Sequence, residues 1–253
     1  MALHVDLTGR RVLVTGASSG IGAAVSRSIV ACGGSVAMLA RRKERLDDLC
    51  DELGERAVGV NGDVTDLDRL EPAIDEAARA LGGLDGLVAA AGKSMTGTIT
   101  TGTPEIWREL FDLNLVGPLA TVRYATSHFP DQGRRDVVLV GSAGSLTPIP
   151  GAAVYAASKR GLRAACDGLR LELAPEGINV GLVMPGMFDT EGLTLDALVI
   201  DGDVPLYDLP YFAAGSGPAP VEPLADTIAF MLGLPEGVAI NEIVVRPTGE
   251  LNP

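Results

Sequence analysis

The residues most able to do chemistry are a tyrosine and a lysine four positions apart. Tyr155 and Lys159 fall in a stretch that reads as a helix, so both side chains lie on one face, one turn apart. A free tyrosine has a pKa of about 10 and is a weak base at neutral pH. A lysine ammonium nearby would lower the pKa of the tyrosine toward neutrality. Such a tyrosine can give a proton to a carbonyl oxygen or take one from an alcohol.

Two further polar residues join this pair if the fold brings them there. Ser142 comes 13 residues before Tyr155 and directly follows an apolar run over 137–140 and one glycine. Asn114 lies in an earlier helical stretch, 28 residues before Ser142. A tyrosine and a lysine at this spacing are frequent on helices by chance. Ser142 follows a strand, at the end of the sheet where α/β proteins bind their ligands. Its position is therefore the main reason to interpret Tyr155 and Lys159 as a catalytic pair.

A glycine-rich turn follows the first apolar run of the chain. It reads TGASSGIG over residues 15–22 and precedes an amphipathic stretch over 21–31. Glycines at such a place let the backbone turn tightly and approach a pyrophosphate at the N-terminus of the next helix. The spacing is GxxxGxG, which differs from the GxGxxG of the common dinucleotide fingerprint. Glycines after a strand often only reverse the chain, but the position after the first strand favours a phosphate site.

A pair of arginines bears on which dinucleotide the glycine turn would bind. The second apolar run, 35–40, ends at Ala40 and is followed by Arg41 and Arg42. Proteins that use NAD generally place an acid at the end of this strand, where it bonds the ribose hydroxyls. Two guanidinium groups instead suit a 2′-phosphate, unless they merely begin a solvated helix. The sequence therefore favours NADP and leaves NAD open as a secondary cofactor.

Apolar runs and helical stretches alternate along the chain and must position these residues. Runs that are apolar on both faces and separated by helices predict a parallel sheet covered on both sides. We expect one α/β domain over 1–253, a Rossmann-like doubly wound parallel sheet with helices on both faces. The expected strands span 11–15, 35–40, 57–60, 84–91, 136–140, 180–184 and 242–245, and the expected helices span 21–31, 43–53, 66–81, 104–128, 155–174 and 222–232.

One segment, 187–220, breaks this alternation. It has weak periodicity, several glycines and prolines, six acidic residues and no lysine or arginine. A long irregular segment inside a compact domain is usually functional, so we expect a substrate lid there. Its charge, together with its leucines and aromatic residues, favours a neutral and fairly apolar ketone or secondary alcohol, although exposed charges are screened by salt.

Composition limits the partners of this 253-residue chain. Its formal net charge of −13 opposes nucleic acid and anionic membrane as partners, because both are approached through basic surface. No apolar window suits a signal peptide or a membrane span. Three separated cysteines and two scattered histidines offer neither a disulfide framework nor a metal site. We expect a cytoplasmic protein that holds no metal and acts on a small molecule.

With these motifs assembled, the chain resembles the short-chain dehydrogenase/reductase family over nearly its whole length. The catalytic tetrad of that family is matched, in order and spacing, by Asn114, Ser142, Tyr155 and Lys159. The resemblance implies that Tyr155 is the general acid/base and that Ser142 holds the substrate oxygen. It further implies that Lys159 binds the nicotinamide ribose and tunes Tyr155, and that Asn114 holds a water that links Lys159 to solvent.

The resemblance also implies a site for the nicotinamide cofactor. The turn at 15–22 matches the family's cofactor turn, and Gly62-Asp63-Val64 matches the motif whose aspartate contacts the adenine edge. A Pro-Gly pair followed by Thr190 matches the segment beside the nicotinamide carboxamide. Besides Tyr155 and Lys159, the residues expected to contact the cofactor are Gly16, Ser18, Ser19, Gly20, Ile21, Arg41, Arg42, Asp63, Val64, Ala91, Gly92, Pro185, Gly186 and Thr190.

The chain departs from the family at one segment. Family members usually carry Asn-Asn-Ala-Gly at the end of the fourth strand, whereas this chain has Ala89-Ala90-Ala91-Gly92. The asparagine that normally ties this strand to its neighbours is absent, so the cofactor site would lose that tie. The tetrad is intact, and we therefore expect an active enzyme.

The function implied by the resemblance is hydride transfer between NADP and a ketone, an aldehyde or a secondary alcohol, as in alcohol dehydrogenases and carbonyl reductases. The segment 241–248 also resembles a subgroup of reductases acting on small hydroxy acids and on biosynthetic aldehydes or ketones, which keeps the substrate open. The alternative is a catalytically idle NADP-binding sensor or scaffold, favoured only by the substitution at 89–90. Family members usually form dimers or tetramers through the helices that carry Asn114 and Tyr155, so we expect a homo-oligomer.

Overall fold

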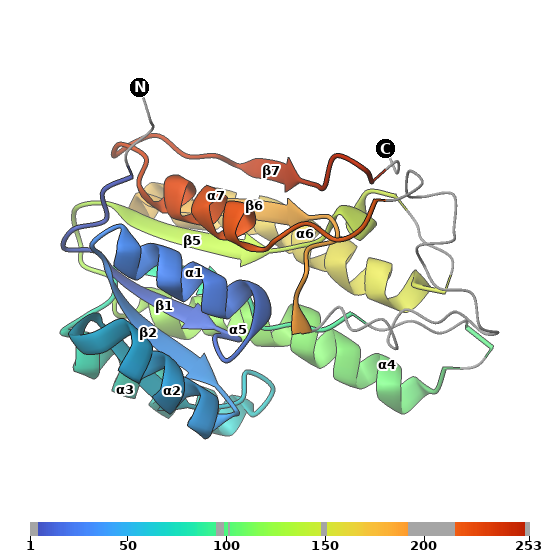
Figure 1. Ribbon diagram of the computed structural model, residues 1–253, viewed down its shortest axis with the longest axis horizontal. Coiled ribbons are helices and arrows are strands. Elements are labelled where there is room, and N and C mark those ends of the chain that lie inside the picture. The colour runs from blue at the N-terminus through green and yellow to red at the C-terminus, as the bar shows by residue number, and fades with distance from the viewer. Residues whose placement is uncertain (1–4, 95–98, 101, 148–150, 192–215, 251–253) are drawn as a thin grey trace.

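A single parallel sheet forms the centre of the computed structural model, which describes residues 5–94, 99–100, 102–147, 151–191 and 216–250 (Figure 1). Its seven strands have the order β3-β2-β1-β4-β5-β6-β7, and all the pairings are parallel. The order reverses between β1 and β4, which is the crevice where doubly wound sheets bind their ligands. The strands are β1 (Arg11–Thr15), β2 (Ser35–Ala40), β3 (Ala57–Asn61), β4 (Gly86–Ala89), β5 (Arg135–Val140), β6 (Ile178–Pro185) and β7 (Glu242–Val245).

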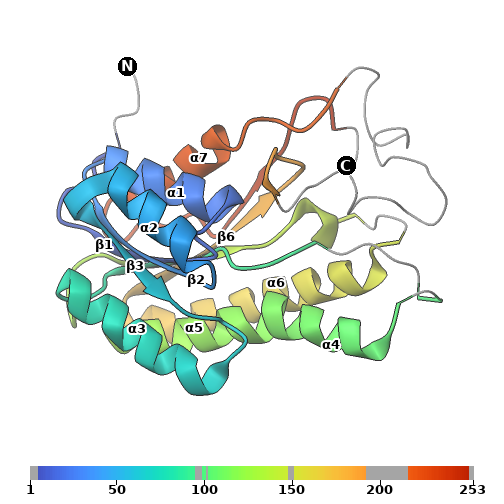
Figure 2. The ribbon, with the colours of Figure 1, turned by 60° about the horizontal axis from the view of Figure 1, so that its bottom comes forward.

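Helices cover both faces of the sheet, so the predicted fold class is confirmed (Figure 2). One face is covered by α1 (Gly20–Ala31), α2 (Lys43–Leu53) and α7 (Glu222–Leu232). The other is covered by α3 (Leu67–Leu81), α5 (Gly117–Thr126) and α6 (Ala153–Leu173), with α4 (Pro104–Phe111) preceding α5. The domain boundary at 1–253 stays a prediction.

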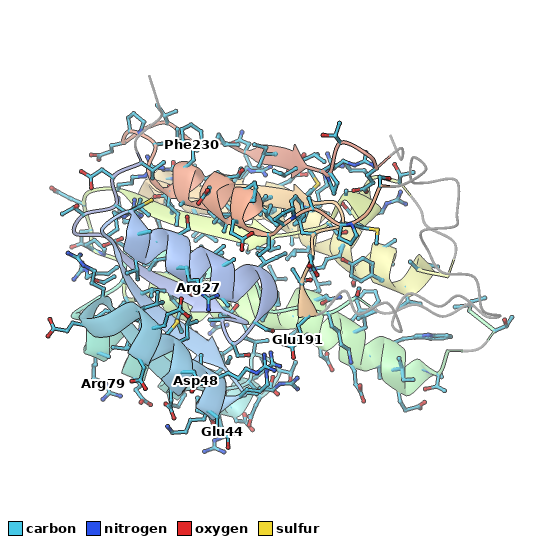
Figure 3. All side chains as sticks on the ribbon, in the orientation of Figure 1. Arg27, Glu44, Asp48, Arg79, Glu191 and Phe230 are labelled. Carbon is cyan, nitrogen blue, oxygen red and sulfur yellow. The ribbon has the colours of Figure 1, made fainter. Side chains whose placement is uncertain are left out.

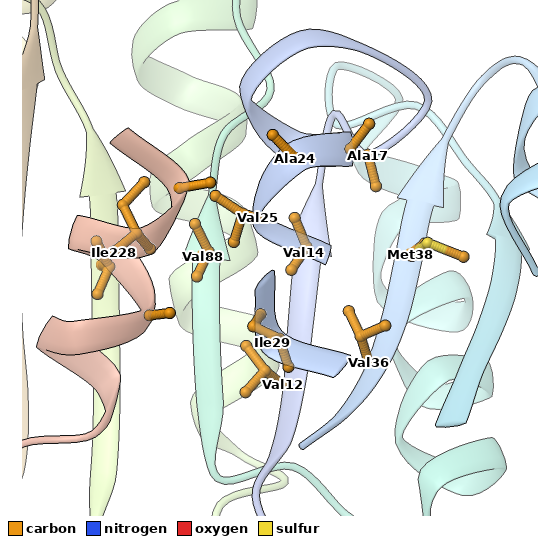
Figure 4. Packing of buried hydrophobic residues seen from close by; sticks show 14 of the residues in the cluster. Val12, Val14, Ala17, Ala24, Val25, Ile29, Val36, Met38, Val88 and Ile228 are labelled. Atoms are coloured by element: carbon orange, nitrogen blue, oxygen red, sulfur yellow. The ribbon is translucent and has the colours of Figure 1, made fainter. Parts of the chain in front are cut away.

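The core under α1 and α7 consists of small branched side chains that interlock between the sheet and the two helices (Figure 4). On β1, Val12 and Val14 belong to this core, whereas Leu13 between them belongs to the core on the opposite face. The three central residues of the strand are all apolar because both faces are buried there. Burial of each such side chain contributes about 1.5–3 kcal/mol. The labelled partners of β1 in this core are Ala24, Val25, Ile29, Val36, Met38, Val88 and Ile228.

The helix expected over 104–128 is interrupted in the structure. After α4, a five-residue π-helical turn spans Asp112–Val116 and leads into α5. Proline has no backbone N–H, so Pro118 cannot donate to the carbonyl of Asn114, four residues earlier. The chain takes a wider turn there, as helices often do at functional sites. This turn carries Asn114, which is fully buried.

A buried ion cluster holds the amino-terminal edge of the sheet. Arg10 Nε lies 2.7 Å from Asp85 Oδ1, and Arg10 Nη2 lies 2.9 Å from Asp136 Oδ2. Arg134 Nε lies 2.8 Å from the same oxygen of Asp136. Breaking such a pair would leave a buried charge without its partner and would be strongly destabilising. The cluster therefore fixes the starts of β1, β4 and β5, at the end of the sheet opposite to the predicted site.

The predicted lid over 187–220 lies mostly outside the described residues. Its two ends are joined to each other in the part that is described. Phe188 and Ala219 form an isolated parallel bridge, in which the N–H of Asp189 donates to the carbonyl of Ala219 at 2.7 Å. The N–H of Ala219 in turn donates to the carbonyl of Met187 at 3.2 Å. The described ends of this segment therefore lie side by side.

Two features are absent from the described ranges. None of the helices there is both long enough and apolar enough to span a membrane. Nor do three or more histidine, cysteine, aspartate or glutamate side chains gather there in a way that could hold a metal ion. The three cysteines carry free thiols, and burial raises the pKa of the Cys166 thiol to about 11.

Candidate active site

The carboxyl ends of the strands open onto a trough made of two adjoining hollows. The first, of about 340 Å³, is lined by the glycine turn and by the ends of β2 and β3. The second, of about 140 Å³, is lined by Ser142, Tyr155 and Lys159. Five residues line both hollows, so the two are continuous. All the residues predicted to contact the cofactor line one hollow or the other, and of the predicted tetrad only Asn114 lines neither.

Three of the four tetrad residues meet at the end of β5. Ser142 follows this strand and accepts a hydrogen bond from the N–H of Gly144 at 3.1 Å, which fixes the serine side chain. Its hydroxyl also hydrogen-bonds the hydroxyl of Tyr155, in the first turn of α6. Lys159 lies one turn further along α6 and donates from Nζ to the carbonyl of Val140 at 3.0 Å. A phenol, a hydroxyl and an ammonium therefore surround one small hollow.

Burial controls the protonation of these groups. Lys159 is 5% exposed, and desolvation of its ammonium lowers its pKa to about 8. Burial also raises the pKa of Tyr155, and the hydrogen bond from Ser142 opposes that rise. The expectation that Lys159 lowers the pKa of Tyr155 is therefore wrong for this structure. The ammonium donates to the Val140 carbonyl, and the pKa of the phenol follows its burial and its hydrogen bond with Ser142.

Asn114 lies behind the trough, where it holds the chain that follows β4. Its Oδ1 accepts from the N–H of Lys93 at 3.1 Å, and its Nδ2 donates to the carbonyl of Lys93 at 3.0 Å. A Cβ added to Gly92 would lie 3.0 Å from Asn114 Oδ1 and 3.3 Å from Lys159 Nζ. A side chain at position 92 would therefore crowd both groups, which would have to shift by a few tenths of an ångström. The water expected between Asn114 and Lys159 stays a prediction.

The chain that follows β4 is held at two places, although no asparagine stands at 89–90. The N–H of Ala91 donates to the hydroxyl of Thr15 at 3.2 Å, which ties the chain after β4 to the end of β1. Asn114 holds the chain at Lys93 by bonding both its backbone N–H and its backbone carbonyl. Sequence reasoning did not single out Thr15 on its own. An apolar run, Val12 to Val14, that ends in a threonine is the signal that could have identified it.

The glycine turn brings the start of α1 to the first hollow. A Cβ on Gly22 would lie 2.5 Å from the carbonyl oxygen of Gly16, so no side chain fits at this position. Ser19 is the N-cap residue of α1, but its side chain makes no capping hydrogen bond. The first N–H groups of a helix have no partner within the helix and favour an anion. Together with the nearby arginines, this donor set fits the pyrophosphate and the 2′-phosphate of a dinucleotide.

The arginines after β2 are engaged with acidic side chains. Arg41 Nη1 lies 3.6 Å from Asp63 Oδ2, in an exposed pair. Arg42 donates to both carboxylate oxygens of Glu191, at 2.9 and 3.0 Å. Arg45, one turn into α2, donates to the same two oxygens at 3.1 Å. Arg45 and Glu191 were not among the predicted site residues, because the two lie 146 positions apart and only the fold brings them together.

Comparisons with known proteins agree with this architecture. The family whose sequence model matches residues 10–196 is described as short chain dehydrogenase. The chain is 35% identical over 249 residues to the glycine betaine reductase of Emericella nidulans, and the match covers 96% of this chain but only 19% of that protein. A dehydrogenase/reductase from Sinorhizobium meliloti is similar in structure, with a TM-score of 0.85, 32% identity and 96% of each chain covered.

A second solved structure bears on the cofactor. It is a short chain dehydrogenase from Burkholderia cenocepacia in complex with NADP, with a TM-score of 0.81 and 30% identity. The similarity covers 95% of this chain and 97% of that chain. The members of this family are oxidoreductases that bind a nicotinamide cofactor. The match over residues 10–196 spans most of the chain, and the chain therefore belongs to the short-chain dehydrogenase family.

Proposed function

We propose that this protein is an NADP-dependent carbonyl reductase or alcohol dehydrogenase, with Tyr155 as its general acid/base. The observation that carries the proposal is the hollow that Ser142, Tyr155 and Lys159 line together, directly beside the trough that fits a dinucleotide. Such a site holds a carbonyl oxygen within reach of a proton donor, which is what reduction by a hydride donor requires.

The chemistry follows from the protonation of the hollow. A bound nicotinamide supplies the hydride. In reduction, Tyr155 gives its phenolic proton to the carbonyl oxygen as the carbonyl carbon takes up the hydride, and Ser142 donates a hydrogen bond to that oxygen. Burial favours the neutral phenol, which is the form that a general acid needs. Lys159 then stabilises the phenolate that remains, and oxidation of an alcohol reverses these transfers.

The cofactor would lie along the trough in one direction. The turn residues at the start of α1 would bind its pyrophosphate, and Asp63 and Val64 its adenine. Arg41 and Arg42 would bind the 2′-phosphate, and Thr190 with the Pro-Gly pair before it would lie beside the nicotinamide. Support for NADP comes from the two guanidinium groups and from the complex of the relative from Burkholderia cenocepacia. NAD stays open as a secondary cofactor.

The substrate is a carbonyl compound or alcohol that is not an anion. The six acidic residues over 187–220 oppose a carboxylate through their charge. The same charge would attract a cation, and the name of the relative from Emericella nidulans includes glycine betaine, which carries a quaternary ammonium group. A substrate panel should therefore contain neutral ketones and aldehydes, keto acids, and an aldehyde with a trimethylammonium group.

The deciding experiment follows nicotinamide absorbance during turnover with NADPH and with NADH across this panel. The Tyr155→Phe variant should lower kcat by about 10²–10⁴-fold, because the proton donor is lost while the ring stays. It should still bind NADPH. Tyr124→Phe on α5, which removes the same hydroxyl away from the trough, is the matched control and should keep its activity.

The other outcomes separate the alternatives. A higher kcat/KM with NADH than with NADPH would contradict the cofactor assignment. Keto acids as the best substrates would contradict the argument from charge. Tight binding of NADPH without turnover of any compound would instead favour the idle sensor or scaffold. Only the substitution at 89–90 supports that alternative, and Thr15 and Asn114 both bond the chain that follows β4.

A further inference from the structure

A carboxylate of the chain itself is held by the two arginines at the edge of the trough. Glu191 follows β6 and Thr190, at the carboxyl end of the sheet (Figure 3). Its two oxygens accept four hydrogen bonds, two from Arg42 at 2.9 and 3.0 Å and two from Arg45 at 3.1 Å. The hydroxyl of Ser19 also bonds it, and Arg42 holds the pKa of the Glu191 carboxyl below its usual range.

The groups around Glu191 form a receptor for an anion. Besides Glu191, Arg42 contacts the hydroxyl of Ser18 at 3.1 Å and that of Ser19 at 2.5 Å. Ser19 is free for this purpose because it does not cap α1. Two guanidinium groups and two hydroxyls beside a helix N-terminus are the donors that a phosphate monoester prefers. A carboxylate satisfies the same donors with fewer oxygens and a smaller charge.

The receptor lies where the trough meets a third, outer hollow. Ser18, Ser19, Gly20 and Thr190 line the cofactor trough and also a hollow of about 880 Å³ between α1, α2 and α7. Arg42 lines the trough, whereas Arg45 and Glu191 line the outer hollow. Glu191 is thus placed to reach the receptor from the outer side. A phosphate that entered from the trough would meet the same guanidinium groups from the inner side.

We propose that Glu191 is an internal competitor for the 2′-phosphate of NADP, and that it sets how strongly this enzyme prefers NADP to NAD. The inference rests on the proposed function, because it assumes that the adenosine ribose lies beside Arg42. Arg42 and Arg45 form a clamp around the Glu191 carboxylate. Binding of a 2′-phosphate requires that the carboxylate leave this clamp, since the two negative groups need the same donors. A cofactor with a plain ribose needs no such displacement, and its affinity does not depend on Glu191.

The test measures binding of two cofactor fragments by calorimetry, with no turnover. Adenosine 2′,5′-bisphosphate carries the 2′-phosphate, and adenosine 5′-monophosphate lacks it. In the variant Glu191→Gln, the bisphosphate should bind about five- to tenfold more tightly, because an exposed ion pair and a like-charge repulsion are both removed. The affinity for the monophosphate should change less than about twofold.

A matched control variant and a multiple-mutant cycle test whether the effect of Glu191→Gln depends on Arg42 and Arg45. Glu44 is an exposed acid on α2, beside Arg45 in sequence, for which the structure gives no ion pair with the clamp (Figure 3). Glu44→Gln changes the net charge of the protein equally and should shift the bisphosphate affinity less than about twofold. In an Arg42→Ala/Arg45→Ala background, Glu191→Gln should no longer tighten binding of the bisphosphate.

The failure of this inference and of the proposed cofactor can be told apart. Suppose that the wild type binds both fragments equally but Glu191→Gln gains affinity for the bisphosphate alone. The role of Glu191 as a competitor is then supported, and the proposed preference for NADP is rejected. If the wild type prefers the bisphosphate and Glu191→Gln changes neither affinity, the role of Glu191 as a competitor is rejected and the preference for NADP is supported. Weaker binding of both fragments to Glu191→Gln would also overturn the inference, because Glu191 would then support the ribose instead of competing for its site.

Discussion

At the scale of single residues, the site depends on two buried groups whose protonation is shifted by desolvation. Lys159 and Tyr155 lie one turn apart on α6, yet the ammonium faces the carbonyl of Val140 and the phenol faces Ser142. The protein therefore keeps a positive charge buried with a single carbonyl as its hydrogen-bond partner in the described structure. Such an arrangement costs stability, and a bound cofactor that accepts a hydrogen bond from the lysine would recover part of that cost.

This cost predicts a stability difference that depends on pH. The pKa of Lys159 is about 8 in the folded protein, against 10.5 for a lysine in water, so the unfolded chain binds more protons between these values. The lysine therefore destabilises the fold fully below pH 8, and less as the pH rises through this window. Lys159→Met should raise the free energy of unfolding at neutral pH, by at most about 3 kcal/mol. The gain should shrink as the pH rises toward the pKa of the unfolded lysine.

Urea unfolding of both proteins at several pH values, at one protein concentration, measures this difference. Lys43→Met is the control, because Lys43 is exposed and pairs with Asp47 on the surface of α2. That pairing raises the pKa of Lys43, so any pH dependence there should have the opposite sign. A Lys159→Met protein that is less stable than the wild type at neutral pH would show that the bond to Val140 outweighs desolvation.

At the scale of elements, the glycine turn and the start of α1 determine whether the trough can form. Gly22 lies inside α1, where an added Cβ would lie 2.5 Å from the carbonyl oxygen of Gly16. Gly168 lies inside α6, where the nearest atom to an added Cβ is the end of the Glu172 side chain at 3.9 Å. The same substitution thus meets backbone in one helix and open space in the other.

We therefore expect opposite effects from two identical substitutions. Gly22→Ala should lower the free energy of unfolding by about 2 kcal/mol and weaken NADPH binding, because the turn must move. Gly168→Ala should raise it by about 0.5–1 kcal/mol, because alanine is the better helix former. Chemical denaturation and NADPH fluorescence titration provide the two readouts. A Gly22→Ala protein of wild-type stability and affinity would contradict the packing argument.

Elements were the part of this molecule that the sequence predicted best. The strands β1, β2 and β7 and the helices α2 and α7 have the predicted bounds, because each is a single apolar run or amphipathic stretch between clear breaks. Residues predicted to contact the cofactor follow β1 and β2 and line the trough, but their contact with a cofactor stays a prediction. The π-helical turn at Asp112–Val116 was missed, since helical periodicity continues through it and only Pro118 indicates the break.

Contacts between distant positions could not be predicted. The clamp joins Arg45 and Glu191, and the cluster at the amino-terminal edge joins Arg10 to Asp136, 126 positions away. Neither pair forms a pattern within one element, and charged residues in a sequence have many equivalent partners. The direction of the pKa shift of Tyr155 was missed for a related reason. It depends on burial by the whole fold, whereas spacing on a helix reports only the neighbour.

At the scale of the whole molecule, the two ends of the sheet serve different purposes. The amino-terminal edge is fixed by buried charges, and the carboxyl edge carries the trough with its polar groups. Apolar side chains are exposed on the helices that the resemblance assigns to the contact between subunits. Ile106 on α4 is 36% exposed, Val116 in the π-helical turn 40%, and Leu171 on α6 79%. We expect these helices to be covered by a second copy of the chain, in a dimer or a tetramer with closed symmetry.

Leu171→Lys tests this assembly, because it places a charge at the predicted contact without disturbing the helix. A lysine near the C-terminus of α6 is favourable toward the helix dipole, so the single chain should not be destabilised. Light scattering after size exclusion should show a lower mass than for the wild type, since an unpaired charge in an interface costs several-fold in affinity or more. Leu67→Lys, at an exposed leucine on α3, should leave the mass unchanged. A monomeric wild type would contradict the prediction of an oligomer. An unchanged mass for Leu171→Lys would show that the contact does not include the C-terminal end of α6.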